Sequence, residues 1–132
     1  MTAEQNKELV TRTLREFARL DFDAALANMS EDASWFICGG LPGVSGLKEG
    51  KAAVAQFTRG VKQAFPEGLQ TEFRKVYCEG DTVIVELTNR AKTATGKNYE
   101  NDYCFVFEIA GGKIRRIREY VDLLTVKETV MS

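Results

Sequence analysis

Histidine is absent from this 132-residue sequence, and its absence removes several catalytic classes at once. Ser-His-Asp and Cys-His nucleophilic catalysis need an imidazole base, and most zinc and non-haem iron sites need histidine ligands. Cysteine is scarce as well, because Cys38, Cys78 and Cys104 are the only three and show no CxxC spacing. This pattern predicts neither a disulfide framework nor a metal site, and it favours reduced thiols in a cytoplasmic protein.

An excess of charge of one sign and long apolar runs are also missing. Eighteen Lys and Arg against nineteen Asp and Glu leave a net charge of -1, so the sequence offers no basic field for nucleic acid. No apolar run approaches the roughly 20 residues of a membrane span. The first residues lack the basic-then-apolar pattern of a signal peptide. We therefore expect neither nucleic acid nor a membrane as a partner.

Glycines gather between residues 39 and 50, but they match no nucleotide-binding loop. In the segment Gly46–Ala52 the first glycine is one residue too close to the lysine, and Ala52 stands where a phosphate loop has Ser or Thr. We therefore predict no cofactor. The chemistry that remains is acid–base or electrostatic work by carboxylates, Tyr, Arg and Asn.

Apolar periodicity predicts an α+β fold that forms one domain over residues 1–132. Helices are expected from a capping box at Thr2 to about Leu20, over residues 24–29, and over Lys51–Ala64; strands are expected over Ala33–Ile37, Leu69–Cys78, Thr82–Lys92, Asn98–Ile109 and Lys113–Leu123, and a loop over Cys38–Gly50. Strands and helices do not alternate along the chain. The order therefore predicts an antiparallel sheet covered by helices on one face.

Two of the predicted strands place polar residues on an otherwise apolar row. Side chains of a strand alternate between faces, so Asn101, Tyr103 and Phe105 share one row of the strand Asn98–Ile109. In the last strand Glu119 lies between the apolar Ile117 and Val121. A simple hairpin between these strands predicts that Glu119 lies near Tyr103, on the face that the helices cover.

The strand Thr82–Lys92 is ambiguous, because both of its rows contain apolar residues. The simplest pairing through Thr95-Gly96 sets Arg90 near Asn101 and Thr88 near Tyr103. Glu86, Thr88 and Arg90 would then face the pocket. A shift of one residue, or a bulge, would reverse this assignment.

Several segments resemble the SnoaL-like group of the ketosteroid isomerase superfamily, whose members share a nuclear-transport-factor-like (cystatin-like) cone. They are Ser34-Trp35-Phe36 with the glycine-rich segment after it, residues 95–103, and Arg118-Glu119-Tyr120-Val121-Asp122. The resemblance implies a cone-shaped α+β domain in which a curved, mixed or antiparallel sheet wraps around three N-terminal helices. It also implies an apolar pocket at the mouth of the cone, carboxylates with hydrogen-bond donors and no cofactor, and a homodimer through the outer sheet face.

Our leading hypothesis is a cofactor-independent acid–base enzyme of isomerase, cyclase or dehydratase type, acting on a small apolar molecule that bears a carbonyl group. Glu119 would be the acid–base residue, and Tyr103, with Asn101 or Arg90, would stabilise an oxyanion. The apolar wall would comprise Trp35, Phe17, Phe57 and Phe105. Whether the chain is an enzyme stays open. The alternatives are a non-catalytic, ligand-binding dimeric domain and a limonene-epoxide-hydrolase-like enzyme with an altered polar set.

The outer sheet face is predicted to carry the contact of a symmetric homodimer. We expect it to present an apolar row that is too large to remain in contact with water. The residues assigned to this row are Val83, Val85, Leu87, Cys104 and Val106.

Overall fold

The computed structural model describes residues 1–132 as four helices and six strands. The helices are α1 (Ala3–Ala18), α2 (Phe22–Ala27), α3 (Lys51–Ala64) and α4 (Leu123–Thr129); the strands are β1 (Met29–Ile37), β2 (Gly46–Glu49), β3 (Gln70–Glu79), β4 (Thr82–Lys92), β5 (Asn98–Ala110) and β6 (Lys113–Val121). No helix combines the length and the apolar character that a membrane span requires.

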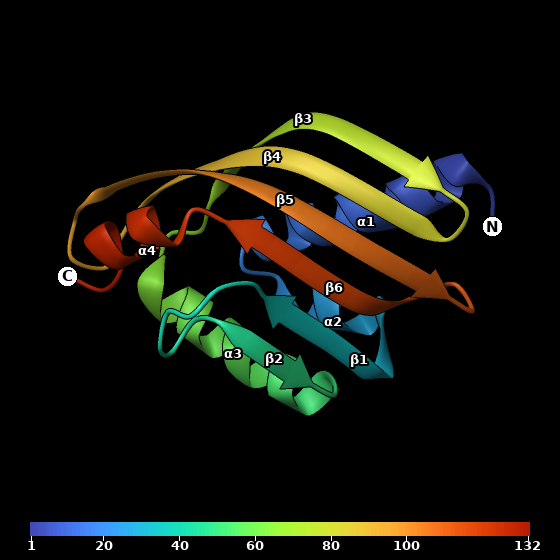
Figure 1. Ribbon diagram of the computed structural model, residues 1–132, viewed down its shortest axis with the longest axis horizontal. Helices are drawn as coiled ribbons and strands as arrows, with labels where there is room; N and C mark the ends of the chain where they lie inside the picture. The colour runs from blue at the N-terminus through green and yellow to red at the C-terminus, as the bar shows by residue number, and fades with distance from the viewer.

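The six strands form one sheet in the order β2-β1-β6-β5-β4-β3. Strand β1 runs parallel to β6, and every other neighbouring pair is antiparallel. Figure 1 shows that the sheet is strongly curved and that α1, α2 and α3 lie behind it, whereas α4 sits at the end where β5 begins. The predicted α+β fold, a curved mixed sheet around three N-terminal helices, is confirmed.

Local sequence signals account for two of the covering helices. Thr2 and Gln5 form a capping box, with Gln5 N donating to Thr2 Oγ1 at 3.1 Å and Thr2 N donating to Gln5 Oε1 at 2.9 Å. Helix α3 ends before Pro66, because proline disfavours helical geometry in the residue that precedes it. Apolar faces of α1 and α3 then pack on the sheet in a core cluster of 18 buried residues that includes Val10 and Val54.

The pairing of β4 with β5 differs from the predicted one by a single residue. Asn89 pairs with Asn101 and Leu87 with Tyr103, so the prediction that Glu86, Thr88 and Arg90 face inward is wrong. The cause is a five-residue connection over residues 93–97, in which Thr93 N donates to Lys97 O at 2.8 Å. Because strand faces alternate, this one extra residue exchanges the two faces of β4.

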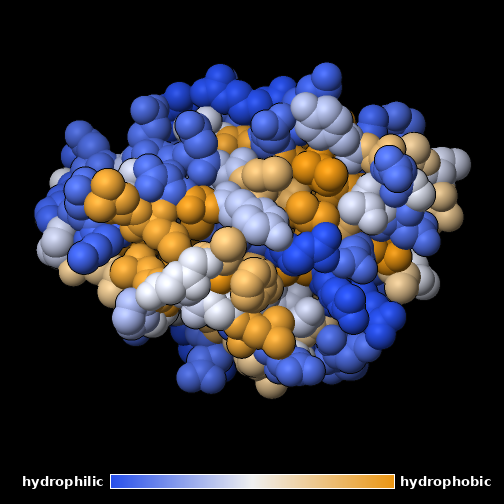
Figure 2. Space-filling model, in the orientation of Figure 1, coloured by the Kyte–Doolittle hydropathy of each residue, from blue (hydrophilic) through white to orange (hydrophobic).

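The same shift changes the composition of the outer face. Val83, Val85 and Leu87 are buried in the core, so their assignment to the outer row is wrong. Cys104 and Val106 pair with Glu86 and Ile84 on the opposite face. The apolar side chains that this face presents are Phe36, Leu47, Tyr77, Ile84, Val106 and Tyr120. In Figure 2, where this face is in view, hydrophilic side chains lie between its apolar areas.

Two elements were not predicted. Strand β2 lies within the segment expected to be a loop, and it pairs with β1 through four residues, among them Lys48 opposite Trp35. Helix α4 follows the last strand, and Asp122 caps it by accepting from Leu124 N at 3.0 Å and Thr125 N at 3.4 Å. Val126 of α4 lines the cavity described next.

Candidate functional site

A cavity of about 310 Å³ lies between the inner face of the sheet and helices α1, α3 and α4. Hydrophobic residues make up 18 of its 23 lining residues. Ligand pockets of drug-sized molecules begin at about this volume and share this apolar lining with a few polar groups. The cavity therefore fits a small, mostly apolar molecule, and its polar side chains decide what chemistry it offers.

Aromatic rings form one wall of the cavity, as the sequence predicted for Phe17, Trp35, Phe57 and Phe105. Trp35 is the centre of this wall: its ring centroid lies 5.0 Å from that of Phe17 and 5.1 Å from that of Phe57. The ring of Phe105 lies 6.2 Å from that of Trp35, nearly perpendicular to it. These rings line the cavity with π surface and hold the Trp35 indole in one orientation.

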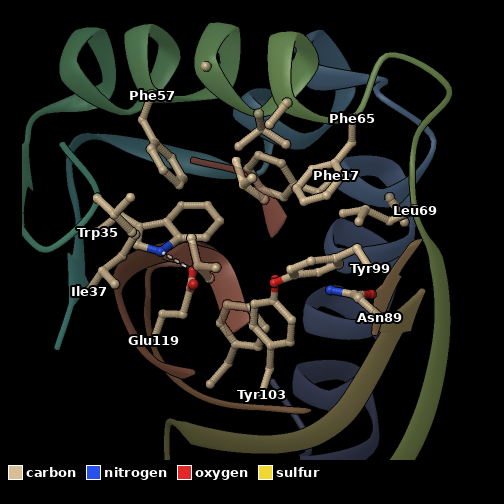
Figure 3. A pocket seen from close by; sticks show the side chains of 18 of the residues that line it. Phe17, Trp35, Ile37, Phe57, Phe65, Leu69, Asn89, Tyr99, Tyr103 and Glu119 are labelled. Atoms are coloured by element: carbon tan, nitrogen blue, oxygen red, sulfur yellow. Dashed lines mark hydrogen bonds between the residues drawn. The ribbon is translucent and has the colours of Figure 1, made fainter. Parts of the chain in front are cut away.

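Glu119 on β6 is buried, and its carboxylate accepts a hydrogen bond from Trp35 Nε1 at 3.0 Å. Figure 3 shows this pair on one side of the cavity floor, with Tyr103 beside it. Burial raises the pKa of Glu119 from 4.5 to about 7, while the Trp35 hydrogen bond and the positive charge of Lys48 act in the opposite direction. A carboxyl group in this state both releases and accepts a proton near neutral pH.

Lys48 on β2 supplies the cation that acts on Glu119. Its ammonium group donates to Val44 O and lies 5.1 Å from the centroid of the Phe57 ring. Burial lowers the pKa of Lys48, and the charge of Glu119 raises it. Lys48 forms no ion pair within 4 Å. It therefore influences Glu119 through space, without neutralising it by contact.

Two tyrosine hydroxyls form the second polar group of the cavity. The hydroxyls of Tyr99 and Tyr103 lie 2.5 Å apart, and Asn101 Nδ2 donates to Tyr99 Oη at 2.9 Å and to Asp122 O at 3.0 Å. Burial raises the pKa of Tyr99 to about 12 and that of Tyr103 well above its usual value. Both phenols are therefore neutral at physiological pH and act as hydrogen-bond donors.

Asn89 and Thr71 complete the polar lining, and the sequence analysis missed both. Thr71 Oγ1 donates to Asn89 Oδ1 at 2.6 Å, from β3 to the neighbouring β4. Asn89 is buried and lines the cavity, where Figure 3 shows its amide nitrogen directed toward Tyr103. The signal that would have revealed it is the apolar alternation of Val83, Val85 and Leu87, which continues to Asn89 on the same row.

The structure brings only part of the predicted site together. Glu119, Tyr103 and the four predicted aromatic residues line the cavity, and Asn101 lies behind Tyr99 as its hydrogen-bond donor. Glu86, Thr88 and Arg90 do not line the cavity, because they project from the opposite face of β4. Their placement in a substrate site is wrong, and so is that of Arg90 beside an oxyanion.

These three residues have partners on the outer face. Tyr77 Oη donates to Glu86 at 3.0 Å, and Thr88 Oγ1 donates to Asp102 at 2.7 Å. Arg90 pairs with Glu100 at 2.6 Å and Glu72 at 2.9 Å. Cross-strand pairs of this kind stabilise an exposed sheet face by fractions of a kcal/mol each, roughly 0.2–1.

The cavity as a whole can move a proton and stabilise negative charge on an oxygen. Glu119 is the single carboxylate among the residues that line the cavity. The neutral polar side chains of the lining include Tyr99, Tyr103, Asn89 and Thr71. No group of three or more carboxylates and thiols lies close enough together to hold a metal ion. The roles of Glu119 and Tyr103 in catalysis stay predictions at this point.

Comparison with known proteins places the chain among structures of the same fold. A family model described as a SnoaL-like domain matches residues 10–117. The structure is similar to Bal32a from a soil-derived mobile gene cassette, with 27% identity, a TM-score of 0.85, and coverage of 97% of this chain and 98% of that one. It is also similar to a candidate isomerase from Bacillus subtilis, with 27% identity, a TM-score of 0.82, and coverage of 98% and 95%.

A third similar structure is a candidate SnoaL-like polyketide cyclase from Jannaschia sp. CCS1. Its identity is 20%, its TM-score 0.82, and the coverage 98% of this chain and 94% of that one. At this identity the likeness supports the fold alone. No curated protein sequence matches the chain.

Proposed function

The chain belongs to the SnoaL-like domain family, and from this premise we propose that it is a cofactor-independent acid–base enzyme of isomerase or cyclase type. Its substrate would be a small apolar molecule that bears a carbonyl group. The observation that carries the proposal is the environment of Glu119: a carboxyl group buried at an apolar cavity, with a pKa of about 7 and neutral phenols on the same floor. An acid–base catalyst works best when its pKa lies near the working pH.

The mechanism assigns one role to each polar group. Ionised Glu119 removes a proton from the carbon next to the substrate carbonyl, and Trp35 Nε1 holds the carboxylate in position. Negative charge then develops on the carbonyl oxygen, where the Tyr103 hydroxyl donates a hydrogen bond to it. Protonated Glu119 returns the proton to a different carbon of the same molecule. In an isomerase the net result is the migration of a double bond. In a cyclase the carbanion carbon instead attacks a second carbonyl carbon of the same molecule and closes the ring, and protonated Glu119 returns the proton to the oxygen of that carbonyl.

One similar structure supports the isomerase type of reaction. This solved structure shares 27% identity with the chain and is named as a candidate isomerase. The limonene-epoxide-hydrolase-like alternative has less support, because that reaction uses a pair of carboxylates with an arginine, and Glu119 is the single carboxylate in the lining.

A non-catalytic ligand-binding domain is the second candidate function. The observation that favours it is the apolar lining, since 18 hydrophobic residues around the cavity suffice to bind an apolar molecule without any reaction. The two candidates differ in what they require of Glu119. Binding alone has no use for its proton.

The proposal includes a homodimer in the cytoplasm. The outer sheet face exposes Tyr77, Tyr120 and Leu47 by 41%, 41% and 58%, together with partly buried Ile84 and Val106. Contact with a second copy would remove this apolar surface from water. The three cysteines are free, as expected for a protein in a reducing compartment.

Exchange of carbon-bound hydrogen for deuterium tests the enzyme proposal without knowledge of the natural substrate. Wild-type protein in D₂O should accelerate exchange beside the carbonyl of simple cyclic ketones such as 1-tetralone, measured by proton NMR. Glu119→Gln keeps the shape of the side chain and removes its proton, so the rate should fall by about a hundredfold or more. Glu86→Gln on the outer face is the matched control and should keep the wild-type rate.

Two outcomes would count against the enzyme proposal. Full exchange by Glu119→Gln would place the base elsewhere. The wild-type protein could also bind the cyclic ketones tightly and accelerate exchange in none of them. This result would favour the ligand-binding domain.

A further inference from the structure

The amide of Asn89 is the polar group of the cavity that the proposed mechanism does not use. Its side-chain oxygen accepts the Thr71 hydroxyl proton at 2.6 Å, and this bond fixes the direction of the amide. The nitrogen therefore points into the cavity, toward Tyr103, as Figure 3 shows. The nitrogen itself donates no hydrogen bond within the protein, since the bond to Thr71 uses the oxygen of the amide. A buried amide donor of this kind is costly unless a partner completes it.

The hydrogen-bond inventory around Tyr103 shows where its own proton can go. Asn101 can only donate to Tyr99, and the Tyr99 hydroxyl lies 2.5 Å from that of Tyr103. Either of these two hydroxyls can be the donor in the bond between them. The Asn89 amide nitrogen faces this hydroxyl and lowers the pKa of the Tyr103 phenol. When Tyr99 is the donor, the single proton of Tyr103 is left for a molecule in the cavity.

We propose that Asn89 and Tyr103 both donate hydrogen bonds to one oxygen atom of the ligand. Asn89 is then a specificity-determining residue for a cyclic ketone or enone. The Tyr103 hydroxyl supplies one hydrogen bond to this oxygen. The second proton of the Asn89 amide, beside the one directed at Tyr103, supplies another. The rest of such a ligand lies against the aromatic wall, where it needs no polar partner.

The inference rests on the proposed function in one respect, the presence of a carbonyl oxygen on the ligand. It makes a separate claim about binding in the ground state. Two neutral donors on one oxygen discriminate strongly against the same molecule without that oxygen, because both donors would then stay buried and unpaired. The cavity should therefore separate a ketone from a hydrocarbon of equal shape.

The test uses 1-tetralone and its hydrocarbon analogue tetralin as probes. Trp35 is the single tryptophan of the chain and lines the cavity, so its fluorescence reports the binding of either molecule. Asn89→Leu should weaken the binding of 1-tetralone by about five- to tenfold, the range expected for the loss of one neutral hydrogen bond. The Kd of tetralin should stay within twofold of the wild-type value or improve.

A spectroscopic readout separates a direct contact from a structural role. The carbonyl carbon of ¹³C-labelled 1-tetralone resonates further downfield the more hydrogen bonds its oxygen accepts. In the Asn89→Leu complex this resonance should move upfield, and Tyr103→Phe should move it further in the same direction. Asn89→Asp, which keeps the hydrogen bond from Thr71, is the second variant. It should weaken the binding of 1-tetralone at least as much as Asn89→Leu does. The control Glu86→Gln should leave the Kd of both probes unchanged.

Three results would overturn the inference. They are equal weakening of 1-tetralone and tetralin by the Asn89 variants, a carbonyl resonance that the variants do not move, and failure of the wild-type protein to prefer 1-tetralone over tetralin. These readouts are independent of the deuterium exchange that tests Glu119. A correct role for Asn89 with an inert Glu119, or the reverse, is therefore recognisable.

Discussion

Replacement of Glu119 by glutamine should stabilise the protein above neutral pH, although it removes a charged residue. The pKa of Glu119 is about 7 in the folded protein and 4.5 in the absence of burial. Between these two values the folded state holds a proton that the unfolded state has released. The free energy of unfolding therefore falls as pH rises through this window, by about 1.4 kcal/mol per pH unit.

The size of the effect follows from the width of that window. A difference between 4.5 and about 7 corresponds to about 3 kcal/mol, all of it lost above pH 7 and none of it below pH 4.5. Glutamine cannot ionise, and its side-chain oxygen can still accept the hydrogen bond from Trp35. The stability of Glu119→Gln relative to wild type should therefore rise by about 3 kcal/mol from pH 4.5 to pH 8.

Urea unfolding at pH 4.5, 5.5, 6.5 and 8 measures this difference directly. Wild type, Glu119→Gln and the outer-face control Glu86→Gln should be compared in the same buffers. The control should follow the wild-type profile, because the carboxylate of Glu86 is exposed and bonded to Tyr77. Parallel profiles for wild type and Glu119→Gln would refute the reasoning, since they would show that the Glu119 carboxyl is not desolvated.

Three further predictions follow from other contacts. Lys48→Met removes a charge that lowers the pKa of Glu119, so the inflection in the pH profile of kcat/KM should move to higher pH; an unmoved or lowered inflection would contradict it. Gly39→Ala should lower the free energy of unfolding by about 1–3 kcal/mol, because Gly39 has a φ of +104° and an added Cβ would lie 2.2 Å from Leu123 Cδ1. Gly40→Ala is its matched control, with open space around the position, and equal losses in urea unfolding would refute the contact. In analytical ultracentrifugation at micromolar concentration the protein should sediment as a homodimer that Val106→Glu on the outer face dissociates, and a monomeric wild type would remove the proposed interface.

The inner rows of β5 and β6 could be predicted because each has one plainly apolar face. The row from Tyr99 to Phe107 is aromatic apart from Asn101, and its neighbour row on β5 carries Glu100 and Asp102. On β4 the alternation is weaker, since Ile84 on the outer row is as apolar as Val85 on the inner one. Its face therefore depends on the length of the connection over residues 93–97, which hydrogen bonds of Thr93 decide.

The features that the sequence analysis missed have separate physical causes. Asn89 and Thr71 were missed because the wrong face of β4 was assigned to the cavity. Lys48 was missed because the glycines of its segment predicted a loop. Helix α4 has only seven residues and no fully buried side chain, so periodicity gave no signal. Asp122 followed three residues later by Thr125 was the available capping signal, and the structure shows both bonded to each other at 3.0 Å.

The pair of Trp35 and Glu119 depends on long-range topology, and its chemistry argues for a use of the proton. Trp35 and Glu119 are 84 positions apart in the sequence, and the parallel pairing of β1 with β6 brings them together. In this pairing Ile37 lies opposite Glu119, and Trp35 is on the same row of β1 as Ile37. An ordinary structural carboxylate would have an ion-pair partner, yet none of the eight ion pairs includes Glu119. Glutamine would accept the same bond from Trp35 without the loss of about 3 kcal/mol at high pH. What glutamate adds at this position is an exchangeable proton, and a binding domain alone has no need of it.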